Sequence, residues 1–218
     1  MKSLKLFERF VTARIGGVPQ PAVENALLDA AIEFCDRTCV VSEIVGPYTI
    51  NPGSDPITID ADRGLDVASV RRVWIAGRTR PLDPLSAQQI EEIYPEGWYD
   101  KSCASVTDLV GWAQVESAGL RLVPYLTVSV PSALTMRVAY KPSRDARELP
   151  DILLSRYPEQ IASGALARLH EHADTTYANP ERVKAYRAEF DAHIMDTVNT
   201  QDIGFGRPML RVAQDDIE

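Results

Sequence analysis

The stretch from residue 150 to 199 constrains the fold more than any other part of the sequence, because it predicts two consecutive helices. The first helix carries a run of small residues between positions 164 and 169. The second begins at Asn179 and Pro180, since asparagine is a favoured N-cap residue and proline suits the first helical turn. Aromatic and aliphatic side chains then recur every four residues, at Tyr186, Phe190, Ile194 and Val198. Neither helix carries a pattern of reactive groups, which favours a structural role for this chain over a catalytic one.

An earlier helix is predicted over residues 21–39. Apolar residues recur there at three- and four-residue steps, at Val23, Leu27, Ala30, Ala31 and Phe34. Residues 40–149 are instead rich in β-branched residues and turn signals, which favours strands. Strict alternation over residues 134–140 gives one of these strands a single buried face. Ser86 and Gln89 fit a capping box, so a short helix is expected within the β-rich region.

These patterns predict a mainly α fold with a β-rich insertion. One N-terminal helix, residues 21–39, and two C-terminal helices, residues 150–199, form a helix bundle. Residues 40–149 form the β-rich insertion of this single domain. Residues 1–20 form an N-terminal arm or a short helix. Residues 200–218 form an extended C-terminal tail, because two glycines and a proline interrupt any helix there.

Composition excludes several classes of protein. With 218 residues and 45% hydrophobic residues, the chain can build a packed core. Its net charge of −8 argues against a general nucleic-acid binder, which carries a basic surplus, but allows DNA to pass by an acidic surface without sticking. No run of 18 apolar residues and no apolar leader are present, so we expect neither a membrane span nor secretion. The three cysteines are an odd number and suit a reduced cytosolic compartment.

Histidine and cysteine spacings predict no metal site. His170 and His172 are two positions apart, so they point roughly 200° apart around a helix axis and cannot chelate one ion. We expect both to lie on a solvated helix face. Cys35 and Cys39 share one face, but zinc would need two further ligands, so buried small side chains explain them better. No metal or cofactor is therefore expected.

No catalytic residue is predicted either. Asp60 and Asp62 follow a short apolar strand and precede Gly64, which favours a turn over a metal site. Neither a P-loop nor a nucleophile elbow is present, and no serine has the histidine pattern of a triad.

Two sets of residues are candidates for contacts with other molecules. Four arginines flank a predicted hairpin turn: Arg71, Arg72, Arg78 and Arg80. They suit contact with DNA phosphate or an acidic partner, and equally suit charges that block pairing at a strand edge. Three small residues share a face of the first C-terminal helix: Gly164, Ala165 and Ala167. That face suits close packing inside the bundle or a contact between subunits.

The helical motifs also resemble a known family. The first helical region has a proline-led start at Pro150, an Arg-Tyr pair at Arg156-Tyr157 and a Gly-Ala-Leu-Ala-Arg-Leu core from Gly164 to Leu169. The second has an Asn-Pro start at Asn179-Pro180, followed by Ala185, Tyr186 and Phe190. A second match is the segment from Ala30 to Cys35. This pattern resembles the head-to-tail adaptor proteins of tailed bacteriophages and covers most of residues 20–195. Pro158 departs from the pattern and interrupts the third helix just after Tyr157.

The resemblance implies a structural, non-enzymatic role in the neck of the virion. Adaptors of this family form a ring, here expected to be dodecameric, that joins the phage portal protein to a tail or nozzle protein. The ring lines a channel through which double-stranded DNA passes without specific binding. During assembly the protein would reside in the host cytoplasm, as a monomer or weak oligomer that forms its ring on the portal.

The C-terminal tail is expected to bind the portal. Its apolar and basic residues are candidates for that contact: Phe205, Arg207, Pro208, Met209, Leu210, Arg211 and Val212. Two alternatives to the adaptor remain. Another phage connector or tail-completion protein such as a tail terminator would be mostly β, which the long helices disfavour. A small hydrolase would need a convergent pair of carboxylates, which the sequence lacks.

Overall fold

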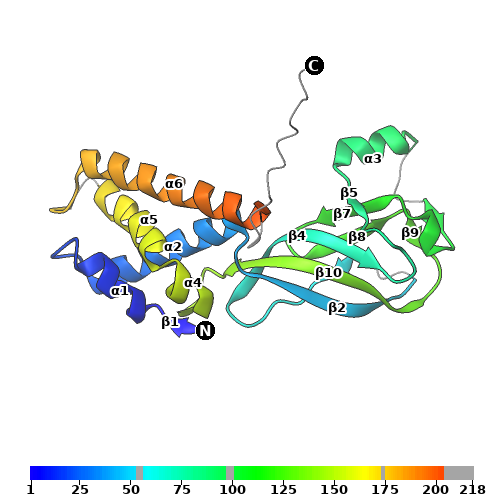
Figure 1. The fold of residues 1–218 in the computed structure, drawn as a ribbon, viewed down its shortest axis with the longest axis horizontal. Helices are drawn as coiled ribbons and strands as arrows, with labels where there is room; N and C mark the ends of the chain where they lie inside the picture. Colours follow the sequence, from blue (N-terminus) through cyan, green and yellow to red (C-terminus); the bar gives the residue numbers. More distant parts are fainter. Residues whose placement is uncertain (53–55, 97–100, 173–174, 204–218) are drawn as a thin grey trace, which may run out of the picture.

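A computed structural model describes residues 1–52, 56–96, 101–172 and 175–203, with side chains described as far as residue 200. The fold is α+β, with about 41% helix and 29% strand in several sheets. Most helices gather at one end of the molecule and most strands at the other (Figure 1). The predicted mainly α fold, a helix bundle carrying a β-rich insertion, is therefore wrong. The strands pair into sheets with a core of their own, and the helical end holds more helices than the three expected. The last helix also continues to Ile203, so residues 200–203 of the predicted extended tail are helical.

Among the described residues, five helices and a small sheet make up the helical end. They are α1 (Lys5–Thr12), α2 (Gln20–Thr38), α4 (Asp151–Arg156), α5 (Pro158–Glu171) and α6 (Pro180–Ile203), with β1 (Lys2–Ser3) paired antiparallel to β11 (Glu148–Leu149). α5 packs against both α2 and α6 (Figure 1). The interruption predicted at Pro158 is confirmed, because α4 ends at Arg156 and α5 begins at Pro158.

Capping residues fix two helix starts as predicted. Asn179 Oδ1 accepts hydrogen bonds from the backbone N–H groups of Glu181 and Arg182, both at 3.1 Å, at the start of α6. Ser86 and Gln89 form a capping box at the start of α3 (Ala87–Ile93). The Ser86 hydroxyl accepts from the Gln89 N–H at 3.3 Å, and Gln89 Oε1 accepts from the Ser86 N–H at 2.8 Å.

The β end contains two larger sheets. The first has the strand order β2–β10–β4 and is antiparallel, built from β2 (Ser42–Ile50), β10 (Val130–Pro142) and β4 (Leu65–Ile75). The second has the order β3–β8–β7–β5, built from β3 (Ile57–Thr58), β8 (Gly119–Val123), β7 (Gly111–Val115) and β5 (Asp83–Pro84). A parallel pair, β6 (Ser102–Cys103) with β9 (Tyr125–Leu126), and the 3-10 helix η1 (Val106–Asp108) complete this end.

The buried face predicted for residues 134–140 is confirmed in β10. Leu134, Met136 and Val138 are fully buried, and Tyr140 is 5% exposed. These side chains face the core of the β end, while Arg137 between them is exposed. The strand alternation therefore places a polar residue on the opposite side of the sheet.

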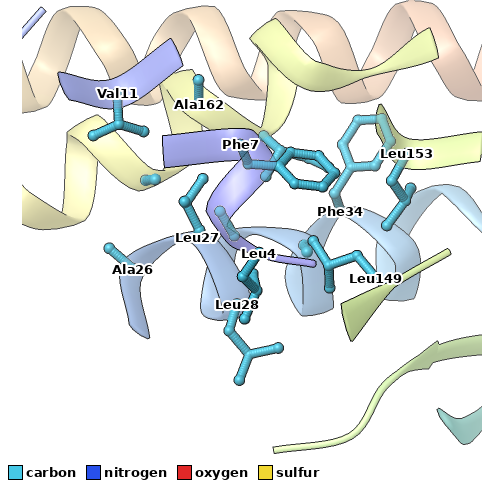
Figure 2. Close-up of a cluster of buried hydrophobic side chains, with 14 of the residues drawn as sticks. Leu4, Phe7, Val11, Ala26, Leu27, Leu28, Phe34, Leu149, Leu153 and Ala162 are labelled. Carbon is cyan, nitrogen blue, oxygen red and sulfur yellow. The ribbon is translucent and has the colours of Figure 1, made fainter. Parts of the chain in front are cut away.

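Apolar side chains form a large cluster at each end of the molecule. Figure 2 shows the helical cluster, in which Phe7 and Val11 of α1 lie with Phe34 of α2. The other cluster lies in the β end and includes the buried face of β10. Val41, which follows α2, packs against both clusters. Lys141 of β10 also reaches Asp36 of α2, with Nζ 2.9 Å from the carboxylate, so the two ends are in contact.

Candidate functional site

One side of the β2–β10–β4 sheet forms an open surface that we call the sheet face. It comprises Ile44 of β2, Arg137 of β10, and Arg72 and Trp74 of β4. Arg137 pairs in register with both Arg72 and Ile44. Arg72 and Arg137 are exposed, Ile44 is 63% exposed and Trp74 is half-buried. Two predicted contact residues, Arg72 and the adjacent exposed Arg71, thus lie at this surface.

A register shift places the arginines at the sheet face. Arg137 lies opposite Arg72, but the next residue of β10, Val138, lies opposite Val70, so Arg71 is an extra residue in β4. Such a bulge interrupts the regular alternation of a strand. In the described part of the chain, Arg71, Arg72 and Arg137 have no ion pair or side-chain hydrogen bond.

The other two predicted arginines lie elsewhere. Arg78 Nη1 donates hydrogen bonds to the carbonyl oxygens of Val106, at 3.3 Å, and Leu109, at 2.6 Å. Arg78 therefore links the segment around η1 to the turn that follows β4 through these hydrogen bonds. Arg80 is exposed after that turn. The structure does not bring the four predicted arginines together as one surface.

The predicted small-residue face lies inside the molecule. Ala165 is fully buried and Ala167 is 3% exposed. Gly164 lies against the ring of Phe190 in α6, so close that a Cβ atom on residue 164 would stand 2.8 Å from the nearest ring carbon. Glycine at this position lets α5 and α6 approach each other.

An ionic network joins α2, α5 and α6, and the sequence reasoning missed it. The Glu33 carboxylate lies 3.1 Å from Arg37 and 2.7 Å from Arg187, and also pairs with Arg168. Arg37 also lies 2.5 Å from Asp191 of α6. Burial raises the pKa of Glu33, but the hydrogen bond from Arg187 and the charges of Arg168 and Arg187 outweigh it, so this pKa lies below its ordinary value. The only sequence signal was the four-residue spacing of Glu33 and Arg37.

Three carboxylates form an acidic cluster on the other side of the sheet. Glu43, Asp60 and Asp62 are exposed, and no ion pair involves them within the described residues. Their charges all act on the phenol of Tyr140. Burial raises the pKa of Tyr140, and the neighbouring Tyr48 and these three carboxylates raise it further. Asp60 and Asp62 thus add negative charge to a surface, beyond the turn that the sequence predicted.

The described histidines and cysteines do not gather at one place, although Cys35 and Cys39 lie one helical turn apart. His170 is buried, Nδ1 shares a 2.7 Å hydrogen bond with the Tyr177 carbonyl, and its ring stacks on Tyr186 at 5.7 Å. The expectation of a solvated His170 is therefore wrong, although His172 is exposed. Burial raises the pKa of the Cys35 thiol, which disfavours the reactive thiolate. Within the described ranges, no group of three or more potential ligands is close enough to hold a metal ion.

Two open grooves flank residues 145–147, with volumes of about 730 and 670 Å³. The first also borders the start of α2, at Gln20, Glu24 and Asn25. Their described lining contains no histidine or cysteine. No helix in the described part of the chain is long and apolar enough to cross a membrane. The predicted portal-binding residues, from Phe205 to Val212, lie outside the described residues.

The surface features found among the described residues are therefore the sheet face, the acidic cluster and two open grooves. The chain matches the family model described as SU10 adaptor protein over residues 9–211, and it belongs to that family. No curated protein matched the sequence. Family membership makes the chain a phage adaptor, a structural kind of protein. It implies portal and tail proteins as partners and the head–tail neck of the virion as the location.

Proposed function

We propose that this protein joins the portal to the tail or nozzle of a tailed phage by forming a ring between them, dodecameric as the resemblance implies. The observation that carries the proposal is the family match over residues 9–211, which includes both ends of the fold. The ring would assemble in the host cytoplasm before becoming part of the virion neck.

The ring lines the channel through which double-stranded DNA passes. The net charge of −8 supports passage without binding, because a negative surface repels phosphate. A gel-shift measurement with duplex DNA at about 150 mM salt should show no stable complex, since the net negative charge of the chain opposes phosphate.

The C-terminal residues 204–218 supply the portal contact. Their composition supports this role, because apolar anchors alternate with arginines in a segment that two glycines and a proline keep from forming a helix. The anchors are Phe205, Pro208, Met209, Leu210 and Val212, and the charged partners are Arg207 and Arg211. Exposed ion pairs contribute only about 0 to 1 kcal/mol each, so the apolar anchors supply most of the affinity.

The ring forms on the portal as a template. A contact of ordinary size between two subunits buries about 800 Å² per partner, and such a contact can be weak because association costs translational and rotational freedom. Docking several copies on one portal removes much of that cost, because neighbouring copies are then held at high effective concentration. The small-residue face contributes to this ring indirectly, by fixing α5 against α6.

Negative-stain imaging of the protein mixed with purified portal tests the proposal. We expect an added ring of density on one end of the portal, and none when an unrelated acidic protein of similar size replaces the adaptor. Portal particles that stay bare at micromolar adaptor concentrations would contradict the proposed function.

A further inference from the structure

The sheet face combines positive charge with exposed apolar surface. Arg72 and Arg137 lie directly opposite each other on neighbouring strands, an arrangement in which like charges repel. No carboxylate neutralises either one within the described residues. Ile44 beside Arg137 is 63% exposed, and Trp74 lies two positions along from Arg72. Arginine and tryptophan are enriched in contacts between proteins, so these features favour a protein partner with an acidic surface.

The acidic cluster of Glu43, Asp60 and Asp62 has the charge that such a partner needs. Glu43 lies on the opposite side of the same sheet, and the charges of all three residues act on Tyr140, whose side chain faces the core on that side. Glu43 pairs in register with Val138, which faces the core, whereas the next pair, Ile44 with Arg137, faces outward. Because successive side chains of a strand point to opposite sides, the side chain of Glu43 points away from the sheet face.

We propose that neighbouring copies of this chain contact each other head to tail, with the sheet face of one copy packed on the acidic cluster of the next. This inference rests on the proposed ring and names its subunit contact. Contact between two different patches of the same chain repeats around an axis and can close into a ring. A two-fold contact between two sheet faces would instead bring Arg72 and Arg137 against their own copies. Complementary charge across the contact sets its orientation and speeds its formation.

DNA is the competing occupant of the sheet face, because arginines also bind phosphate. Two features favour the second copy. Exposed Ile44 and half-buried Trp74 give the surface an apolar part that a phosphate backbone does not match. The net charge of −8 also makes a second copy an acidic partner, and it opposes the approach of DNA to the molecule as a whole.

Paired charge reversals test the contact. The first variant, Arg72→Glu with Arg137→Glu, makes the sheet face acidic. The second, Glu43→Lys with Asp62→Lys, makes the acidic cluster basic by an equal and opposite change of charge. Self-association is measured by sedimentation velocity at about 10 mM salt, where charges act over roughly 30 Å. Circular dichroism of each variant establishes that it folds.

We expect the wild type to self-associate at low salt, and each variant alone to associate roughly tenfold or more weakly, because each then has like charges on both patches. Mixing the two variants should restore association, because the acidic sheet face of the first variant then meets the basic cluster of the second, and the basic sheet face of the second meets the acidic cluster of the first. The control is Arg182→Glu with Lys184→Glu, an equal charge change at exposed positions of α6, and it should associate as the wild type does.

Three results would overturn the inference: a wild type that remains monomeric at low salt, a mixture that fails to associate, or variants that associate as tightly as the wild type. The inference would also be overturned if the wild type bound duplex DNA at low salt and the Arg72→Glu, Arg137→Glu variant lost that binding without any change in self-association. That result would assign the sheet face to DNA. Failure of the ring proposal is distinguishable, because the wild type would then leave portal particles bare whatever the mixing experiment shows.

Discussion

Substituting Gly164 with alanine tests how tightly α5 and α6 pack. In an open helix the change is stabilising, because glycine costs about 0.8–1.0 kcal/mol relative to alanine in a helix interior. Here the new Cβ would stand 2.8, 2.9 and 3.0 Å from three ring carbons of Phe190. Those distances are too short for carbon atoms, whose optimal separation is about 3.5–4.0 Å, so the ring or the helix must move.

The Phe190 ring has little freedom to move. It is fully buried, and its centroid lies 6.2 Å from that of Phe34 in α2. The guanidinium carbons of Arg168 and Arg187 each lie 5.9 Å from its centroid. Overpacking of such a site costs about 1–3 kcal/mol, which exceeds the gain in helix propensity. We therefore expect Gly164→Ala to lower the free energy of unfolding by about 1 kcal/mol.

Urea denaturation followed by far-UV circular dichroism measures this difference, and a second background decides its cause. In a Phe190→Leu protein two of the three contacting ring carbons have no counterpart and the remaining branch can rotate. There Gly164→Ala should raise the free energy of unfolding by about 0.5–1 kcal/mol. Gly16→Ala is the control, since no atom lies within 4 Å of its added Cβ. A stabilising Gly164→Ala in the wild-type background would refute the tight contact.

Four further outcomes are expected. Glu33→Gln should destabilise the protein by about 1–3 kcal/mol in thermal or urea unfolding, because three arginines lose a charged acceptor. The pKa of Glu33 is lowered in the folded state, so this residue contributes to the free energy of unfolding at pH values above its ordinary pKa of 4.5. That contribution is lost as the pH falls through the lower folded-state pKa. The free energies of unfolding of the wild type and the variant should therefore converge in acid. Excess chelator should leave the melting temperature unchanged, whereas a fall of many degrees would reveal a structural metal. Removing residues 204–218 should leave melting nearly unchanged and abolish portal attachment in a pull-down, and full attachment of the truncated chain would place the contact elsewhere. Calorimetry should show one cooperative transition for the whole chain, because Val41 packs on both clusters, and two separated transitions would contradict a single folding unit.

Local patterns predicted the parts of the fold that depend on neighbouring residues. Asn179 and Ser86 start helices through hydrogen bonds that span only two or three positions. The buried face of β10 follows from alternation alone. The balance of helix and strand could not be obtained this way, because β10 pairs with β2 and β4, which are distant in sequence. Strands of two residues, such as β5, carry too short a pattern to recognise.

The candidate contact residues show the same division. Arg71 and Arg72 were singled out from sequence, but Arg137 was not, since only the strand register places it opposite Arg72. That register depends on the bulge in β4, which no local signal marks. His170 was misplaced for a similar reason, because its burial follows from the hydrogen bond to the Tyr177 carbonyl and the ring of Tyr186, both contributed by the chain after α5.

The arginines of this chain divide according to where their charge is satisfied. At the helical end several pair with carboxylates of other elements, as Arg14, Arg37, Arg144, Arg168 and Arg187 do. These pairs connect segments far apart in sequence and so contribute to the fold. At the sheet face, Arg72 and Arg137 face each other, and no carboxylate among the described residues pairs with either of them.

 The chain contains 31 acidic residues among 218, so the missing counter-charge does not reflect a shortage of carboxylates. A like-charge pair across two strands weakens the isolated sheet slightly, and in the contact we propose the carboxylates of Glu43, Asp60 and Asp62 on a second copy supply the matching charge.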